Sequence, residues 1–248
     1  MRGVIRKSLA VAAGLLFLVP ASALAGEASV VNGVPQYDAF LGETNHVVVG
    51  QQPGPAGTKK VIYRDTVEVK PGPGCSRIND FAAECGVQNA PSFARAFLGN
   101  GNDSIDPSAV DPLSNTGLSV QGNTGADELN GGPARDLLDG GDGPDEIRGA
   151  LGNDDIEGEG GEDLVIGDGG NDTLSGGIHG DTLIGGTGVD NLSGDGGDDV
   201  LNGDDNAGGD SLNCGESLFD DDLAIFNGAN AGNPGDVVFS NCERTQQG

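Results

Sequence analysis

A nine-residue unit repeats nine times without a break from Gly122 to Asn202, and this repeat constrains the fold more than any other feature of the sequence. Position 1 of the unit is glycine, position 6 is aspartate and position 8 is Leu, Ile or Val in every copy. Position 4 is glycine except at Ala134 and His179. A unit this short buries only one apolar side chain, so it must stack on its neighbours to form a core.

The spacing inside the unit predicts a turn followed by a short strand. The apolar residue at position 8 lies between mostly polar neighbours, which is the alternation of a strand with one buried face. The glycines before it permit positive φ and tight turns. We therefore expect a strand of about three residues after a turn of about six, with two units in each coil of a solenoid. Alternate units would then form two parallel sheets.

Ten aspartates are the candidate metal ligands, nine from position 6 of the regular units and one from a unit two residues longer: Asp127, Asp136, Asp145, Asp154, Asp163, Asp172, Asp181, Asp190, Asp199 and Asp210. In such a solenoid they form two columns with neighbours roughly 4.8 Å apart, the spacing of adjacent strands. Carboxylates at that distance repel by about 0.9 kcal/mol even in water. A divalent cation that prefers oxygen removes this repulsion, and calcium accepts such ligands in more flexible geometry than magnesium does.

These repeats resemble the RTX (repeats-in-toxin) nonapeptide G-G-x-G-x-D-x-U-x, a signature of calcium-binding parallel β-rolls. The resemblance implies an all-β fold, with several calcium ions held between coils by the position-6 aspartates and turn carbonyls. Degenerate copies flank the regular units. Asp103 occupies position 6 in one, whereas Leu118 replaces the aspartate in another, where we expect no complete calcium site. The alternative, a disordered Gly/Asp-rich tract, is our expectation only for the calcium-free state.

Acidic residues are concentrated in the repeats. The chain contains 39 Asp and Glu against 12 Lys and Arg, a formal net charge of −27. Of these, 32 acidic and only three basic residues follow residue 97. Such a negative field excludes nucleic acid and anionic membrane as partners and favours cations.

The first 25 residues predict a secretory signal peptide. Arg2, Arg6 and Lys7 precede the apolar run 9–19, and small residues suit cleavage after Ala25. The apolar run is too short to span a membrane, and an uncleaved anchor is the alternative. We therefore expect a secreted, extracellular protein without a membrane span.

The four cysteines favour two disulfides, because an even number in an exported chain is typical of structural bonds. Three pairings are available to Cys75, Cys85, Cys214 and Cys242. Proximity in the sequence favours Cys75 with Cys85 and Cys214 with Cys242.

The chain divides into four expected segments: a signal peptide (1–25), a β-rich N-terminal cap region (26–97), the β-roll (98–212) and a disulfide-tied C-terminal cap (213–248). The N-terminal region has short β-rich runs between Gly/Pro turns, which either cap the solenoid or begin it with irregular coils. The tail is richer in large apolar residues. It either closes the open end of the solenoid or forms a docking patch.

Nothing in the sequence predicts catalysis. There are two histidines, His46 and His179, and neither a zinc-protease nor a serine-hydrolase motif. We predict a calcium-binding protein that is not an enzyme, with a structural or adhesive role at the cell exterior and a polysaccharide or cell-surface partner. The alternative is a divergent extracellular enzyme that acts on polysaccharides along the solenoid face. Its aromatic platforms would be few, because the chain has no Trp and only Tyr37 and Tyr63.

Overall fold

The computed structural model describes residues 26–32, 34–39, 44–53, 59–65, 69–73, 75–79, 82–87, 93–107, 116–203, 209–215, 221–226, 235–239, 241–242 and 244–247. These residues form strands and turns, and none of them lies in a helix that could cross a membrane. The expected signal peptide, residues 1–25, lies outside the described residues.

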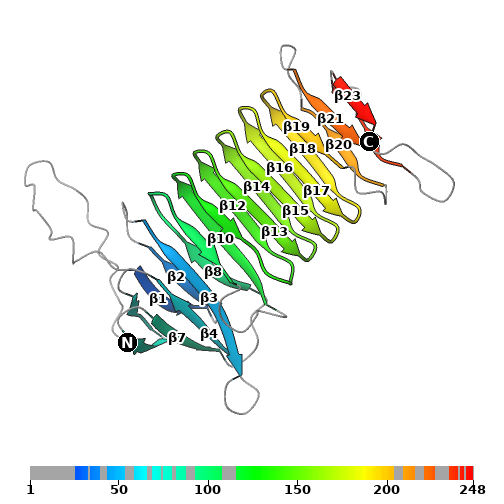
Figure 1. The fold of residues 1–248 in the computed structure, drawn as a ribbon. Coiled ribbons are helices and arrows are strands. Elements are labelled where there is room, and N and C mark those ends of the chain that lie inside the picture. The colour runs from blue at the N-terminus through cyan, green and yellow to red at the C-terminus, as the bar shows by residue number, and fades with distance from the viewer. Residues whose placement is uncertain are drawn as a thin grey trace, which may run out of the picture.

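The strands form two sheets, here named A and B, which enclose a narrow core (Figure 1). Sheet A has the order β22 (Val237–Val238), β20 (Ser211–Asn213), β18 (Asn191–Gly196), β16 (Thr173–Ile178), β14 (Asp155–Gly160), β12 (Leu137–Asp142), β10 (Gly117–Thr124), β8 (Phe93–Phe97), β2 (Val34–Asp38), β1 (Gly26–Val31) and β5 (Val69–Pro71). Sheet B has the order β23 (Arg244–Gln247), β21 (Leu223–Phe226), β19 (Val200–Asn202), β17 (Thr182–Thr187), β15 (Leu164–Gly169), β13 (Glu146–Leu151), β11 (Glu128–Asn130), β9 (Ser104–Asp106), β3 (His46–Pro53), β4 (Lys59–Arg64), β7 (Ala82–Val87) and β6 (Cys75–Asn79).

Successive units alternate between the two sheets, so two units complete one coil. Leu138 pairs with Ile156 in sheet A, and Ile147 pairs with Val165 in sheet B, both in parallel strands. The coils stack in chain order between the two ends of the molecule (Figure 1). The predicted all-β parallel β-roll with alternate units in two sheets is confirmed.

The strands are longer, and the turns shorter, than the sequence spacing predicts. From β12 to β18 each strand spans six residues, from position 7 of one unit to position 3 of the next. The prediction of a strand of about three residues is therefore wrong. Pairing continues past the glycine at position 1 because position 2 is left-handed, as at Gly141 (φ +103°) and Asp168 (φ +69°). Glycine, Asn and Asp adopt this conformation most readily.

The core of the repeats is a row of aliphatic side chains from position 8. Leu129, Ile147 and Val165 are fully buried, and their equivalents in the other units are at most 2% exposed. Position 1 cannot hold a second side chain, because a Cβ on Gly194 would lie only 2.3 Å from Oδ2 of Asp199 in the same unit. The roll therefore has room for one large apolar residue in each unit.

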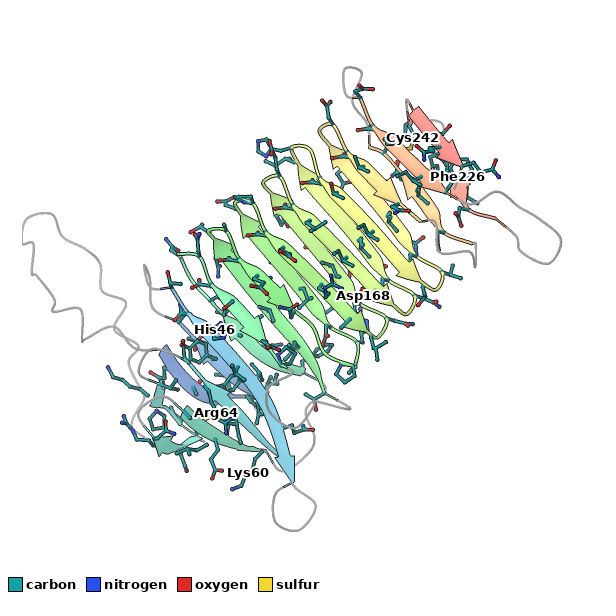
Figure 2. All side chains as sticks on the ribbon, viewed as in Figure 1. His46, Lys60, Arg64, Asp168, Phe226 and Cys242 are labelled. Carbon is teal, nitrogen blue, oxygen red and sulfur yellow. A yellow bond between two sulfur atoms is a disulfide. The ribbon has the colours of Figure 1, made fainter. Side chains whose placement is uncertain are left out.

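The N-terminal region extends both sheets with antiparallel strands. β1 pairs with β2, and β3, β4, β7 and β6 form an antiparallel series. A disulfide joins Cys75 to Cys85 across β6 and β7, and the rings of Tyr37 and Tyr63 stack inside at 5.9 Å between centroids. Figure 2 places His46, Lys60 and Arg64 at this end of the molecule, with Phe226 and Cys242 at the other.

The C-terminal strands continue the parallel pairing beyond the regular repeats. β20 and β22 extend sheet A, while β21 and β23 extend sheet B. The second predicted disulfide joins Cys214 to Cys242. Both predicted cysteine pairings are thus confirmed.

Candidate metal centre

All ten predicted aspartates lie in the two columns, buried between coils. The first column contains Asp127, Asp145, Asp163, Asp181 and Asp199, and the second contains Asp136, Asp154, Asp172, Asp190 and Asp210. None of these residues is more than 4% exposed. Each aspartate ends a turn and precedes a strand, so the stacking of units aligns the carboxyl groups along the axis of the roll.

One carboxylate oxygen of each aspartate is held by the backbone of the preceding coil. Oδ1 of Asp145 accepts a hydrogen bond from the backbone N–H of Asp127 at 2.7 Å, and Oδ1 of Asp163 accepts one from Asp145 at 2.8 Å. The same bond recurs along both columns. Sequence reasoning missed this role, in which the aspartate side chain replaces a backbone acceptor in the turn, because it considered only the charge of the columns.

The second carboxylate oxygen faces the space between coils. Oδ2 is buried and accepts no hydrogen bond in six of the aspartates: Asp127, Asp145, Asp154, Asp163, Asp172 and Asp181. A buried polar atom without a partner is costly, and for a charged carboxylate the cost is larger still. A cation bound at these oxygens would remove that cost.

Backbone carbonyls converge on the same space. A Cβ built on Gly122 would lie 2.3 Å from the carbonyl oxygen of Gly140 in the next coil and 2.5 Å from Oδ2 of Asp127. The turns approach each other even more closely, since a Cβ on Gly170 would lie 1.3 Å from the carbonyl oxygen of Gly152. The donors gathered here are carboxylate and carbonyl oxygens, the hard ligands that calcium prefers. The residues therefore fit a calcium ion.

Basic side chains do not neutralise the columns. The regular repeats contain two, Arg135 and Arg148. Arg135 pairs with Asp155 at 3.3 Å and Arg148 pairs with Asp168 at 2.7 Å, both partly exposed and outside the columns. The countercharge for the buried aspartates must therefore come from protons or a bound cation.

Burial raises the pKa of the column carboxyls. The pKa rises to about 7 at Asp145 and Asp154 and to about 6 at Asp127 and Asp163, because desolvation disfavours the charged form. Neighbouring aspartates of the same column raise it further at Asp145 and Asp154. Hydrogen bonds from the backbone act in the opposite direction. Such carboxyls release their protons readily to a competing cation at neutral pH.

A surface groove runs beside the first column. A groove of about 620 Å³ is lined by Asp127, Asp145 and Asp163, with Glu128 and Glu162 among the residues beside them. Acidic side chains at the rim attract cations toward the buried carboxylates.

Three further aspartates extend the columns. Asp103 donates its N–H to Asp127 Oδ1, Asp222 accepts from Asp199 N–H at 2.8 Å, and Asp236 accepts from Asp210 N–H at 3.2 Å. Asp103 stood in an outlying copy of the unit, but Asp222 and Asp236 were missed. The remaining signal was an aspartate two residues before an apolar residue, Ala224 or Val238, without glycine at positions 1 and 4 of the unit.

The described residues contain no group of three or more His, Cys, Asp or Glu side chains placed to hold one metal ion. A calcium site in this roll would therefore take carboxylate oxygens from at most two coils and complete its shell with carbonyl oxygens. The histidines lie outside the columns: His46 Nδ1 contacts Ser104 Oγ on the exposed face of sheet B, and His179 occupies a left-handed turn position (φ +87°).

Comparison with known proteins points to the same segment. A family model of the RTX calcium-binding nonapeptide repeat, in four copies, matches residues 119–147, 139–174 and 175–208. No match was found among curated proteins or among solved structures.

Proposed function

We propose that the chain is a secreted protein that folds its repeats on binding calcium and acts as a structural or adhesive element outside the cell. The match of residues 119–208 to the RTX calcium-binding nonapeptide repeat supports the calcium-binding part of this proposal. The single observation that carries the proposal is the buried Oδ2 of six column aspartates, from Asp127 to Asp181 with the exception of Asp136, which accepts no hydrogen bond and lies near carbonyl oxygens of the next coil.

Calcium would bind at the junctions between successive aspartates of one column. Each such junction brings together two carboxylates and the carbonyls of two turns, enough oxygen donors for most of the shell of six to eight that calcium takes. The nine regular units provide four junctions in the first column, from Asp127 to Asp199, and three in the second, from Asp136 to Asp190. We therefore expect roughly seven ions in this part of the roll, all held by similar ligands.

Folding and binding would be linked because the sites exist only in the stacked chain. An extended unit presents one aspartate, whereas a site requires two coils in register. A ligand that binds only the folded state stabilises it in proportion to the logarithm of its concentration. The repeats would thus remain unfolded at low calcium and fold at the millimolar calcium found outside cells, where sites of modest affinity fill.

The extracellular setting is supported by the two disulfides, Cys75–Cys85 and Cys214–Cys242, which persist in oxidising compartments. A roll with an acidic, ordered and solvent-facing surface suits a role as a scaffold at the cell exterior, with a polysaccharide or cell-surface partner.

Isothermal titration calorimetry of the oxidised chain from residue 26 onward tests this function. We expect several equivalents of calcium to bind and magnesium to bind at least about tenfold more weakly, because magnesium demands a small, strict octahedral shell. Failure to detect calcium binding at millimolar concentrations would refute the proposal.

A further inference from the structure

We infer that, at the N-terminal end of the roll, hydrogen-bond donors of the protein occupy the places where the inner coils bind calcium. This end therefore folds without calcium and acts as a template for the repeats. The inference rests on the proposed calcium binding of the inner junctions. At the first junction of each column, however, hydrogen bonds take the place of the calcium ion.

The first column begins with an asparagine. Asn45 precedes strand β3 as each column aspartate precedes its strand, and its backbone N–H donates to Asp103 Oδ1 at 2.6 Å. This is the bond that links Asp127 to Asp145 in the inner coils. Asn45 therefore occupies position 6 of the first coil, with an amide in place of a carboxylate.

The amide nitrogen lies where an inner aspartate has an oxygen. Nδ2 of Asn45 donates to the carbonyl oxygen of Leu98, at position 1 of the next unit, at 3.2 Å, and to Asp103 Oδ1 at 3.0 Å. In the inner coils the equivalent carbonyl is that of Gly140, and its oxygen and Oδ2 of Asp127 both lie beside Gly122. Two such oxygens repel each other unless a cation lies between them. At Asn45 the N–H group supplies the positive end of the contact itself.

The carboxylate of Asp65, which lies beyond Asn45, also receives hydrogen bonds from the protein. Asp65 is buried, and its Oδ1 accepts the backbone N–H of His46 while its Oδ2 accepts the hydroxyl of Tyr37. Both oxygens of this carboxylate thus have donors from the protein, and no oxygen is left facing another coil without one.

The second column begins with a leucine. Leu118, 1% exposed, takes the position of the aspartate, and its N–H donates to Asp136 Oδ1 at 2.6 Å. Oδ2 of Asp136 accepts the N–H of Gly132 at 2.6 Å, whereas Oδ2 of Asp154 in the next coil accepts no hydrogen bond. The first junction of this column therefore contains one carboxylate, with both oxygens hydrogen-bonded.

Two independent substitutions, Asn45 and Leu118, thus remove the second carboxylate at the same end of both columns. The strands at this end also carry the Cys75–Cys85 disulfide and the stacked Tyr37 and Tyr63. An end that is stable without calcium presents one folded edge of sheet A and one of sheet B, and the first repeats can pair with these edges. This pairing removes the free-energy cost of nucleating an isolated coil.

Hydrogen exchange measured by mass spectrometry, in chelator and in millimolar calcium, tests the inference. In chelator we expect peptides from β3, β9 and β10 to exchange at least about tenfold more slowly than peptides from β15 and β16, and calcium to protect the latter. Equally fast exchange of both groups in chelator, with calcium protecting both, would overturn this inference alone. Equal protection of β15 and β16 in chelator and in calcium would overturn the proposed function.

The variant Asn45→Asp tests the amide directly. It replaces the donor with an acceptor, so exchange of β3 and β9 in chelator should accelerate about tenfold or more. Asn130→Asp is the matched control, because it adds the same charge on the outer face of β11, where Asn130 contacts Glu128, and should leave β3 and β9 unchanged. Leu118→Asp should accelerate exchange of β10 in the same way. Unchanged exchange in chelator for both Asn45→Asp and Leu118→Asp would refute the inference.

Discussion

Oδ1 of Asp145 accepts the backbone N–H of Asp127, which lies 18 residues earlier, at 2.7 Å. The carboxylate therefore has two tasks, since Oδ1 closes the turn of the preceding coil and Oδ2 faces the next junction. An asparagine would retain the first task through its carbonyl oxygen and lose the charge needed for the second. This separation allows structure and metal binding to be tested apart.

Asp163→Asn should lower the calcium stoichiometry by up to two ions, because Asp163 takes part in two junctions of its column. Its Oδ1 can still accept the N–H of Asp145, so the calcium-loaded roll should retain its strands. Calorimetric titration with calcium measures the loss. Asp142→Asn, at an exposed turn-side position of β12, is the control and should bind as many ions as the unaltered chain. Equal stoichiometry for both variants would contradict the assignment of the columns.

Gly170→Ala should destabilise the calcium-loaded roll by about 1–3 kcal/mol or more, because Gly170 has φ +145° and a Cβ there would meet the carbonyl oxygen of Gly152. Gly132→Ala is the matched control, since nothing lies within 4 Å of its Cβ position. The control should change stability by less than about 1 kcal/mol. Urea unfolding in millimolar calcium compares the two midpoints, and equal shifts would contradict the close packing of the turns.

Leu174→Ala should cost about 2–5 kcal/mol, because Leu174 is 1% exposed and belongs to the single aliphatic row of the core. Leu164→Ala removes the same atoms from the outer face of β15, where the residue is half-buried, and should cost roughly 1 kcal/mol. Urea unfolding again provides the measurement. A larger loss for Leu164→Ala would mean that the outer face is itself covered.

Acidification should favour the calcium-free fold. The pKa of the column carboxyls is raised by burial, to about 6 at Asp127 and about 7 at Asp145. A raised pKa in the folded state contributes stability that is present below the ordinary aspartate value near 4 and is lost as the pH rises through about 6–7. Circular dichroism in chelator should therefore show β structure increasing from pH 7 to about pH 4. Loss of β structure over this range would contradict the buried columns.

Calcium affinity should have the opposite dependence on pH. Protons and calcium compete for the same carboxylates, so affinity should fall as the pH decreases through about 6–7. Titrations at two values of pH on either side of this range check the sign. Affinity that is independent of pH would indicate that calcium binds elsewhere.

The sequence predicted the repeat architecture because the register of the nine units is strict. Fixed offsets of Gly122, Asp127 and Leu129 determine which side chains face inward, and no long-range information is needed to stack identical units. The two disulfides were also predictable, because each pair is close in sequence. The length of the strands was not, since it depends on the left-handed φ of position 2, which non-glycine residues such as Asp168 also adopt.

The ends of the columns were less predictable. Asp222 and Asp236 lack the glycine turn that marks a unit, so only their place beside Asp199 and Asp210 reveals them. Asn45 lies far from the repeats in sequence and joins the first column only through the pairing of β3 with β9. Contacts of this kind arise from tertiary stacking, which no local pattern encodes.

The most direct test of the account is a far-UV circular dichroism titration of the oxidised chain from residue 26 onward, from chelator to millimolar calcium, with magnesium as control. The account predicts a cooperative gain of β signal with calcium and little change with magnesium, because only calcium fills the junctions between the columns. A spectrum that is already fully β in chelator at neutral pH, and unchanged by calcium, would contradict it.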